Sequence, residues 1–389
     1  MPLLSYLDTN KLTHTFELGP IRPPSEAYSL LIRATRNCPW NKCLFCPVYK
    51  GTKFELRTVE EIQRDIEAAK AISDGINEIA GKMGYGGSVR EVAAMLYNQQ
   101  EYEQCVRNVA LWLFAGGKSA FLQDSNTLIM KTPELVQVIT FLRKTFPNIN
   151  RVTTYGRSQT AARKSLEELK DLKAAGLDRI HIGLESGYDP VLTYMQKGVT
   201  AEKHITGGRK VVEAGISLCE YVMPGLGGKK MSHEHARETA RVLNEINPDY
   251  IRLRSLHVHS IMPLWSKMHD GDFELQTEDE VVKEIGIFVE NLQVTSYLKS
   301  DHILNLLMEV EGKMPEDKQK CLDIINEYLN LPDEEKLNFK FGRRLGYYEK
   351  LSDLKDSYGH YKIDEVITQI KCRGENMDEV LFKLKDGFI

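Results

Sequence analysis

The feature that most constrains the fold of this chain is a series of six short runs rich in β-branched and aromatic residues, each followed by a stretch with helical periodicity. The runs lie at residues 27–33, 119–123, 151–155, 179–184, 217–222 and 250–256. Neighbouring parallel strands need crossover connections, and helices supply them. Six strand-helix units in series therefore predict an α/β fold with a parallel sheet.

Helix starts are marked by capping residues. Thr58 with Glu61, and Ser165 with Glu168, have the spacing of a capping box. Thr132 stands before a proline and is predicted to be an N-cap. These signals support the strand-helix alternation.

Two regions interrupt the alternation. Residues 74–115 insert a mostly helical segment with glycine punctuation, and the sequence after residue 265 is charged and helical in pattern. We expect an N-terminal extension at 1–26, a core at 27–265 that contains the insertion, and a helical C-terminal extension at 266–389.

The charge is nearly balanced, with 51 Lys and Arg residues against 55 Asp and Glu and a net charge of −4. No basic field indicates nucleic acid, and no run approaches the roughly 18 apolar residues of a membrane span. Single, scattered cysteines (Cys105, Cys219, Cys321, Cys372) do not form a secreted disulfide framework. We expect a cytoplasmic protein with no nucleic-acid or membrane partner.

Three further cysteines lie within nine positions, in the pattern Cys38-x4-Cys43-x2-Cys46. They follow the first predicted strand, at the edge of the sheet where parallel α/β folds place their chemistry. Structural zinc usually takes four protein ligands, and no partner pair follows downstream. Three thiolates with an open fourth position suit a 4Fe-4S cluster whose unique iron binds an external molecule. A zinc site is the alternative.

With this loop the chain resembles the radical S-adenosylmethionine (SAM) superfamily, over roughly residues 27–265. The usual family motif has one residue fewer between its first two cysteines. A second segment, "HIGLESGYDPVLTYMQKG", resembles oxygen-independent coproporphyrinogen oxidases and methylthiotransferases. The resemblance implies a partly open (β/α)6 TIM-like barrel, one 4Fe-4S cluster held by Cys38, Cys43 and Cys46, and bound SAM. Reductive cleavage of SAM would yield a 5′-deoxyadenosyl radical that abstracts hydrogen from a substrate.

The resemblance also assigns cofactor contacts. By position, Phe45 would lie near the adenine, Glu185 would reach the ribose hydroxyls, and Lys197 would pair with the SAM carboxylate. The alternative for Glu185 and Lys197 is a pair of solvated charges at a strand end. "LQDSNTL" occupies the place of the motif that binds the SAM ammonium. The further candidates for the cofactor site are Asp124, Ser125, Arg157, Met223 and Gly225.

The last predicted strand indicates the substrate. Arg252 and Arg254 share one face by two-residue alternation, and His257 follows. Buried arginines need either carboxylate partners or an anionic ligand. We favour the ligand, and therefore predict a small carboxylate or phosphate metabolite. Tyr155 and Tyr221 are the candidate acid or hydrogen donors from their strand positions.

Three functions compete on this evidence. The favoured one is a radical SAM enzyme supplied with electrons by a flavodoxin or ferredoxin. The second is a SAM- or heme-binding protein that kept the barrel and lost catalysis. The third is a zinc-stabilised interaction protein. The adjacent His233, Glu234 and His235 are expected to form a polar first helical turn, because histidines two apart on a helix point in different directions.

Overall fold

The computed structural model describes residues 10–83 and 88–387. Within these residues the chain is α/β, with a mostly parallel sheet of eight strands. The chain divides into two compact units, which are described separately below. Unit 1 comprises the residues up to Asn41, Val48–Ile182 and Lys210–Leu218, and unit 2 comprises Lys42–Pro47, Gly183–Arg209 and the residues from Cys219 onward.

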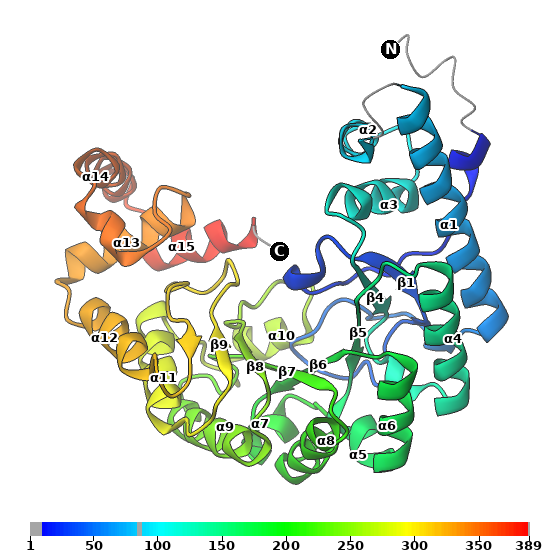
Figure 1. The fold of residues 1–389 in the computed structure, drawn as a ribbon. Helices are drawn as coiled ribbons and strands as arrows, with labels where there is room; N and C mark the ends of the chain where they lie inside the picture. The colour runs from blue at the N-terminus through cyan, green and yellow to red at the C-terminus, as the bar shows by residue number, and fades with distance from the viewer. Residues whose placement is uncertain (1–9, 84–87, 388–389) are drawn as a thin grey trace. The chain divides into compact units, whose positions relative to one another are not determined.

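Unit 1 is built on parallel strands in the order β1, β4, β5 and β6. Their bounds are β1 (Leu30–Arg33), β4 (Ser119–Gln123), β5 (Arg151–Gly156) and β6 (Arg179–Glu185), the last three residues of β6 belonging to unit 2. Its helices are α1 (Val59–Lys82), α2 (Val89–Tyr97), α3 (Gln104–Phe114), α4 (Thr132–Thr145), α5 (Ser158–Arg163) and α6 (Leu166–Ala175). In Figure 1, α1 and α4 lie along one side of these strands. Buried Leu30 and Ile32 face this helical layer by strand alternation.

Short elements complete unit 1. An antiparallel pair, β2 (Thr35–Arg36) and β3 (Glu55–Leu56), brackets the cysteine loop in the chain. Three short 3₁₀ turns are η2 (Asn10–Thr13), η3 (Pro24–Glu26) and η4 (Thr127–Ile129). The insertion predicted at 74–115 contains α2 and α3, but residues 74–82 continue α1 without a break. The helical periodicity of α1 thus runs past residue 74.

Unit 2 continues with β7, β8, β9 and β10 in that order. The strands are β7 (Ser217–Val222), β8 (Tyr250–Leu253), β9 (Tyr297–Lys299) and β10 (Gly312–Lys313), with β7–β8 and β8–β9 parallel and β9–β10 antiparallel. The helices are α7 (Asp189–Tyr194), α8 (Ala201–Glu213, whose last turn lies in unit 1), α9 (Ser232–Ile246), α10 (Pro263–His269), α11 (Glu278–Asn291), α12 (Lys318–Leu329), α13 (Asp333–Arg344), α14 (Ser357–Cys372) and α15 (Met377–Asp386), with the turn η5 (Leu351–Lys355).

The α/β class and all six predicted strands are confirmed, each within a few residues of its predicted bounds. Both capping boxes are also confirmed. Thr132 is not an N-cap, because Lys131 takes that position and the Thr132 hydroxyl donates instead to Glu168 at 2.7 Å. The C-terminal extension is not wholly helical, since β9 and β10 lie in it. The domain boundaries themselves stay a prediction.

None of the helices in the described part of the chain has the length and apolar character needed to cross a membrane.

Candidate active site

The start of the cysteine loop, in unit 1, is turned by two asparagines. Asn37 and Asn41 have φ angles of 67° and 48°, in the left-handed region that asparagine tolerates better than most residues. The Asn41 amide donates to the Cys38 Sγ at 3.4 Å. Hydrogen bonds from backbone amides stabilise a thiolate, so this turn suits Cys38 to bind a cation.

Asp124, predicted to touch the cofactor, anchors this part of the loop. Its side chain is fully buried and accepts from the Arg33 Nη2 at 2.9 Å and from the Asn37 amide at 3.1 Å. The Tyr49 hydroxyl also donates to it. Ser125 reaches the same turn, donating to the Asn37 carbonyl at 3.1 Å. Both residues therefore hold the loop backbone, and a direct contact with SAM stays a prediction.

The predicted residues on β5 lie at the end of that strand. The Arg157 guanidinium lies 5.2 Å from the ring centroid of Trp40, an aromatic of the cysteine loop. The Tyr155 ring makes edge contacts with Phe121 at 5.0 Å and His181 at 6.1 Å. A cation over an aromatic face is attracted by the ring quadrupole, so the Trp40 contact directs Arg157 toward the cysteine loop.

The second part of the loop, residues 42–47, belongs to unit 2 and is packed in apolar surroundings. Phe45 is 8% exposed within a buried cluster, and Cys43 and Cys46 pack against that cluster. The Leu44 amide donates to the Met195 carbonyl at 3.1 Å, and its carbonyl accepts from Leu264 at 3.0 Å. The other buried members of the cluster are Val191, Met195, Leu226, Leu256, Val258, Leu264 and Phe273. The two thiols are thus positioned from both sides in a setting of low polarity.

Glu185 and Lys197 meet at the end of β6. Lys197 Nζ lies 3.1 Å from Glu185 Oε1 and 5.6 Å from the centroid of the Phe45 ring. Their side chains are only 13% and 12% exposed, so the alternative of two solvated charges is wrong. A Cβ at Gly183 would lie 2.1 Å from Glu185 Oε1, so a larger residue there would displace the Glu185 carboxylate. The structure therefore brings together an acid, an amine and an aromatic that were predicted separately.

Glu220, on β7, was missed by the sequence reasoning. It is fully buried, and neither carboxyl oxygen has a hydrogen-bond partner within the described residues. Burial raises the pKa of Glu220 well above its usual range, the nearby Glu185 carboxylate raises it further, and Lys197 opposes the rise. Glu220 is therefore held as a neutral acid behind the Glu185–Lys197 pair. The signal in the sequence was a single acidic residue within an otherwise mostly apolar strand segment.

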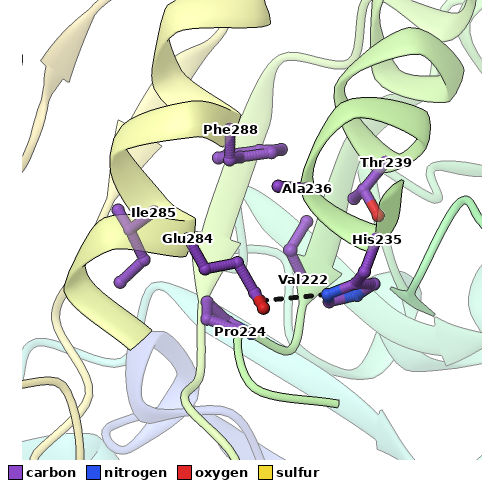
Figure 2. A pocket seen from close by; sticks show the side chains of 8 residues that line it. All are labelled: Val222, Pro224, His235, Ala236, Thr239, Glu284, Ile285 and Phe288. Carbon is purple, nitrogen blue, oxygen red and sulfur yellow. Dashed lines mark hydrogen bonds and ion pairs between the residues drawn. The ribbon is translucent and has the colours of Figure 1, made fainter. Parts of the chain in front are cut away.

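A buried network fixes the turn after β7, and Figure 2 shows its contact between Glu284 and His235. The Gly225 amide donates to Glu284 Oε1 at 2.8 Å, and Gly225 has a φ of 87° that favours glycine. His235 Nδ1 lies 3.0 Å from the same oxygen, and its Nε2 lies 3.3 Å from the Glu185 carbonyl. That carbonyl also accepts from the Met223 amide at 3.0 Å. The predicted adenine-side backbone is thus held by α9 and α11.

His235 is more than part of a polar helical turn, because its side chain is 1% exposed and faces Glu284. The space between these helices is small, about 10 Å³, and is lined by Val222, Pro224, His235, Ala236, Thr239, Glu284, Ile285 and Phe288. It has room for about one water molecule and not for a cofactor. No local pattern predicts this pairing, since Glu284 lies 49 residues further on.

Arg252, on β8, and Arg254, just after it, lie in different surroundings. Arg252 Nη1 forms an ion pair with Asp301 at 2.6 Å, so the expectation that it awaits a ligand was wrong for this residue. Asp301 follows β9, a strand that was not predicted. Arg254 is exposed and has no ion pair within the described chain. Burial, and then the Arg254 charge, lower the pKa of His302 to about 4.

Tyr221 and His257 lie in the same unit. The Tyr221 side chain is half-buried on the face of β7 next to Arg252. His257 is 3% exposed, its Nε2 lies 2.7 Å from Asp386, and its ring centroid lies 4.7 Å from that of Phe382. Because α15 covers His257, a substrate contact at this residue requires that helix to move.

The donor set suits a metal cluster. Cys38, Cys43 and Cys46 are each half-buried, and thiolates in this environment suit iron-sulfur ligation. Across residues 10–83 and 88–387, no group of three His, Cys, Asp or Glu side chains is already placed to hold a metal ion. Ligation by the three cysteines therefore stays a prediction.

Comparison with known proteins identifies one domain in this chain. Residues 99–241 match the model of the radical SAM superfamily. The chain carries a radical SAM domain. The match runs from α3 to α9 and leaves the cysteine loop outside it. A radical SAM domain implies binding of a 4Fe-4S cluster and SAM, and it supports SAM-cleavage chemistry in an enzyme.

Two curated relatives are tRNA uridine(34) acetyltransferases. The protein from Methanocaldococcus jannaschii is 21% identical over 121 residues, which cover 31% of this chain and 22% of that relative. The one from Methanocaldococcus infernus is 21% identical over 123 residues, covering 31% and 23%. The radical SAM chain thus spans less than a quarter of the length of these relatives. Among solved structures, coproporphyrinogen III oxidase from Escherichia coli overlaps with a TM-score of 0.41 at 15% identity, covering 72% of this chain and 54% of that one.

Proposed function

We propose that this protein is a radical SAM enzyme that abstracts hydrogen from an anionic substrate, with Cys38, Cys43 and Cys46 as the cluster ligands. A bound cluster and SAM supply one-electron cleavage of the sulfonium, which yields methionine and a 5′-deoxyadenosyl radical that takes the substrate hydrogen. The electron comes from an external donor such as a flavodoxin or ferredoxin. The observation that carries the proposal is the apolar packing of Cys43 and Cys46 beside Phe45 and Lys197.

The side chains of unit 2 have distinct roles in this proposal. The Lys197 ammonium is positioned by Glu185 to attract a carboxylate, and Glu185 retains a second oxygen that can accept from a hydroxyl pair. His235 and Glu284 hold the backbone of Glu185 and Gly225 in place. The buried cluster around Phe45 excludes water, which protects a radical from side reactions.

Arg254 supports an anionic substrate. It is an exposed arginine with no ion pair in the described residues, just after the strand whose arginine, Arg252, is already neutralised by Asp301. A carboxylate or phosphate would pair with its guanidinium. RNA is the second candidate substrate, because the curated relatives are by name tRNA-modifying enzymes and an RNA phosphate carries the same charge. We therefore drop the expectation that this protein has no nucleic-acid partner.

Anaerobic reconstitution tests the cluster. We expect iron and sulfide to bind, dithionite to bleach the visible absorption, and reduced protein to release 5′-deoxyadenosine from SAM. Replacement of Cys43 by serine should abolish cluster assembly, whereas replacement of Cys372, which is exposed on α14, should not. Zinc in place of iron would support the interaction protein, and a cluster without SAM cleavage would support the silent carrier.

Substrate class is tested by hydrogen transfer. Deuterated metabolite extracts and deuterated RNA are supplied separately, and deuterium is measured in 5′-deoxyadenosine by mass spectrometry. Arg254→Met should abolish transfer from the substrate while uncoupled SAM cleavage continues. The matched control is Arg163→Met, an exposed arginine on α5. Equal transfer by the Arg254 variant would rule out the anion-binding role.

A further inference from the structure

We propose that unit 1 carries a second ligand site, a pocket for a small aromatic molecule with an anionic group. The cavity has a volume of about 350 Å³ and is lined by Arg22, Ala27, Tyr28, Ala94, Tyr97, Asn98, Leu111 and Phe114. Small-molecule sites in proteins start at about this size. It is built by α2, α3 and the segment before β1. It therefore lies at the start of β1, whereas Cys38 follows the end of that strand.

Each of the two helices presents an apolar pair to the cavity. Ala94 and Tyr97 are three residues apart on α2, and Leu111 and Phe114 are three apart on α3, so each pair shares one helix face. α2 and α3 also place Val92, Ala93, Leu96, Val106, Val109 and Ala110 in the buried core. Of the lining residues, Ala94, Leu111 and Phe114 are only partly buried and Tyr97 is exposed. They leave an open apolar surface where close packing is the rule.

Three of the eight lining residues are aromatic, and two of these rings remain accessible. Tyr28 is 58% exposed and Tyr97 is 37% exposed, which is high for large side chains gathered in one place. Arginines hold two of the rings. The Arg107 guanidinium lies 5.6 Å from the centroid of Tyr97 and donates to the Tyr97 carbonyl at 3.0 Å, and Arg90 lies 4.6 Å from the centroid of Phe114. Rings fixed in this way suit stacking or edge contacts with a planar ligand.

The positive charge in the lining of the cavity favours an anionic ligand. Arg22 is the single charged residue among those that line the cavity, and it is exposed without an ion pair in the described chain. The nearest acid in sequence, Glu26, is fully buried and is committed to Arg151 at 3.0 Å and to Ser29. Arg90 and Arg107 add positive charge beside the rings. A carboxylate, sulfonate or phosphate attached to an aromatic system satisfies both features of the pocket.

The test uses 2-naphthoate as the probe and 2-naphthamide as its neutral isostere, with binding to the cluster-loaded protein measured by calorimetry. We expect saturable, one-to-one binding of the naphthoate and weaker binding of the amide. Tyr97→Ala should weaken naphthoate binding about tenfold, as loss of an aromatic contact in a binding site does. Arg22→Gln should remove the preference for the naphthoate.

Ala94→Leu fills the cavity without removing any contact and should block both probes, which keeps the test valid if Tyr97→Ala unfolds. The controls are Tyr358→Ala and Arg163→Gln, an exposed tyrosine and an exposed arginine outside the pocket. Circular dichroism checks that each variant is folded, and SAM cleavage should be unchanged in all of them. Absence of saturable binding, or binding that Ala94→Leu and Arg22→Gln leave unchanged, would overturn the proposal.

Discussion

The buried Glu220 gives the sharpest prediction about this protein. Its raised pKa means that the folded protein holds one more proton than the unfolded chain once the pH exceeds the ordinary glutamate range. Glu220 therefore lowers the free energy of unfolding. This loss of stability increases with pH until the pH reaches the folded-state pKa of Glu220. Each pH unit in that window costs about 1.4 kcal/mol. Replacing Glu220 by glutamine, an uncharged side chain of similar shape, removes this titration.

As the pH rises above the ordinary glutamate range, the free energy of unfolding of the Glu220→Gln variant should therefore gain on that of the wild type, by about 1.4 kcal/mol for each pH unit until the folded-state pKa is reached. Urea unfolding followed by circular dichroism at pH 5, 6 and 7 measures this change. The infrared spectrum at pH 7 should also show the carbonyl stretch of a protonated carboxylic acid in the wild type and not in the variant.

Glu167→Gln is the matched control, because Glu167 is an exposed glutamate on α6. Its unfolding curves should run parallel to those of the wild type at every pH. If the Glu220→Gln curves also run parallel, or if the infrared band is absent from the wild type, Glu220 is ionised in the folded protein. The account of its environment would then be wrong.

Three further predictions concern other buried groups. Asp124→Asn removes the carboxylate that pairs with Arg33. The free energy of unfolding measured with urea should fall by about 2–4 kcal/mol, and iron uptake should decrease. Unchanged stability and iron content would contradict the anchoring role of Asp124. Glu284→Gln weakens the acceptor of the Gly225 amide and should raise the Kd for SAM in equilibrium dialysis. An unchanged Kd would show that the hydrogen bonds of Glu284 do not support SAM binding. The pKa of His302 is lowered to about 4, so stability should fall as pH drops from 6.5 toward 4, by up to about 3 kcal/mol, and His302→Gln should abolish that slope in acid-unfolding experiments.

Part of the candidate site could be predicted from the sequence because it depends on short stretches of chain. Cys38, Cys43 and Cys46 are defined by spacing within one loop, and their placement after the first strand follows from the order of elements. Lys197 was assigned together with Glu185 from one continuous segment, and the two side chains do meet. These inferences need no knowledge of what packs against the segment.

Other residues took their roles from partners far away in sequence. Arg252 is neutralised by Asp301, which lies 49 residues further on, and His257 meets Asp386 after 129 residues. Asp124 anchors the cysteine loop through Arg33, which lies 91 residues before it. No local pattern specifies such pairs, because they form only when separate elements pack.

The sequence by itself determined the α/β class, the order of the strands, the capped starts of α1 and α6, and the cysteine spacing. Each of these follows from hydrophobic periodicity or from contacts within a few residues. Only the tertiary structure decided which charges are neutralised, which acid is buried without a partner, and that α2 and α3 enclose a cavity. Burial and ion pairing depend on the distance between side chains in space, and that distance is set by packing across the fold.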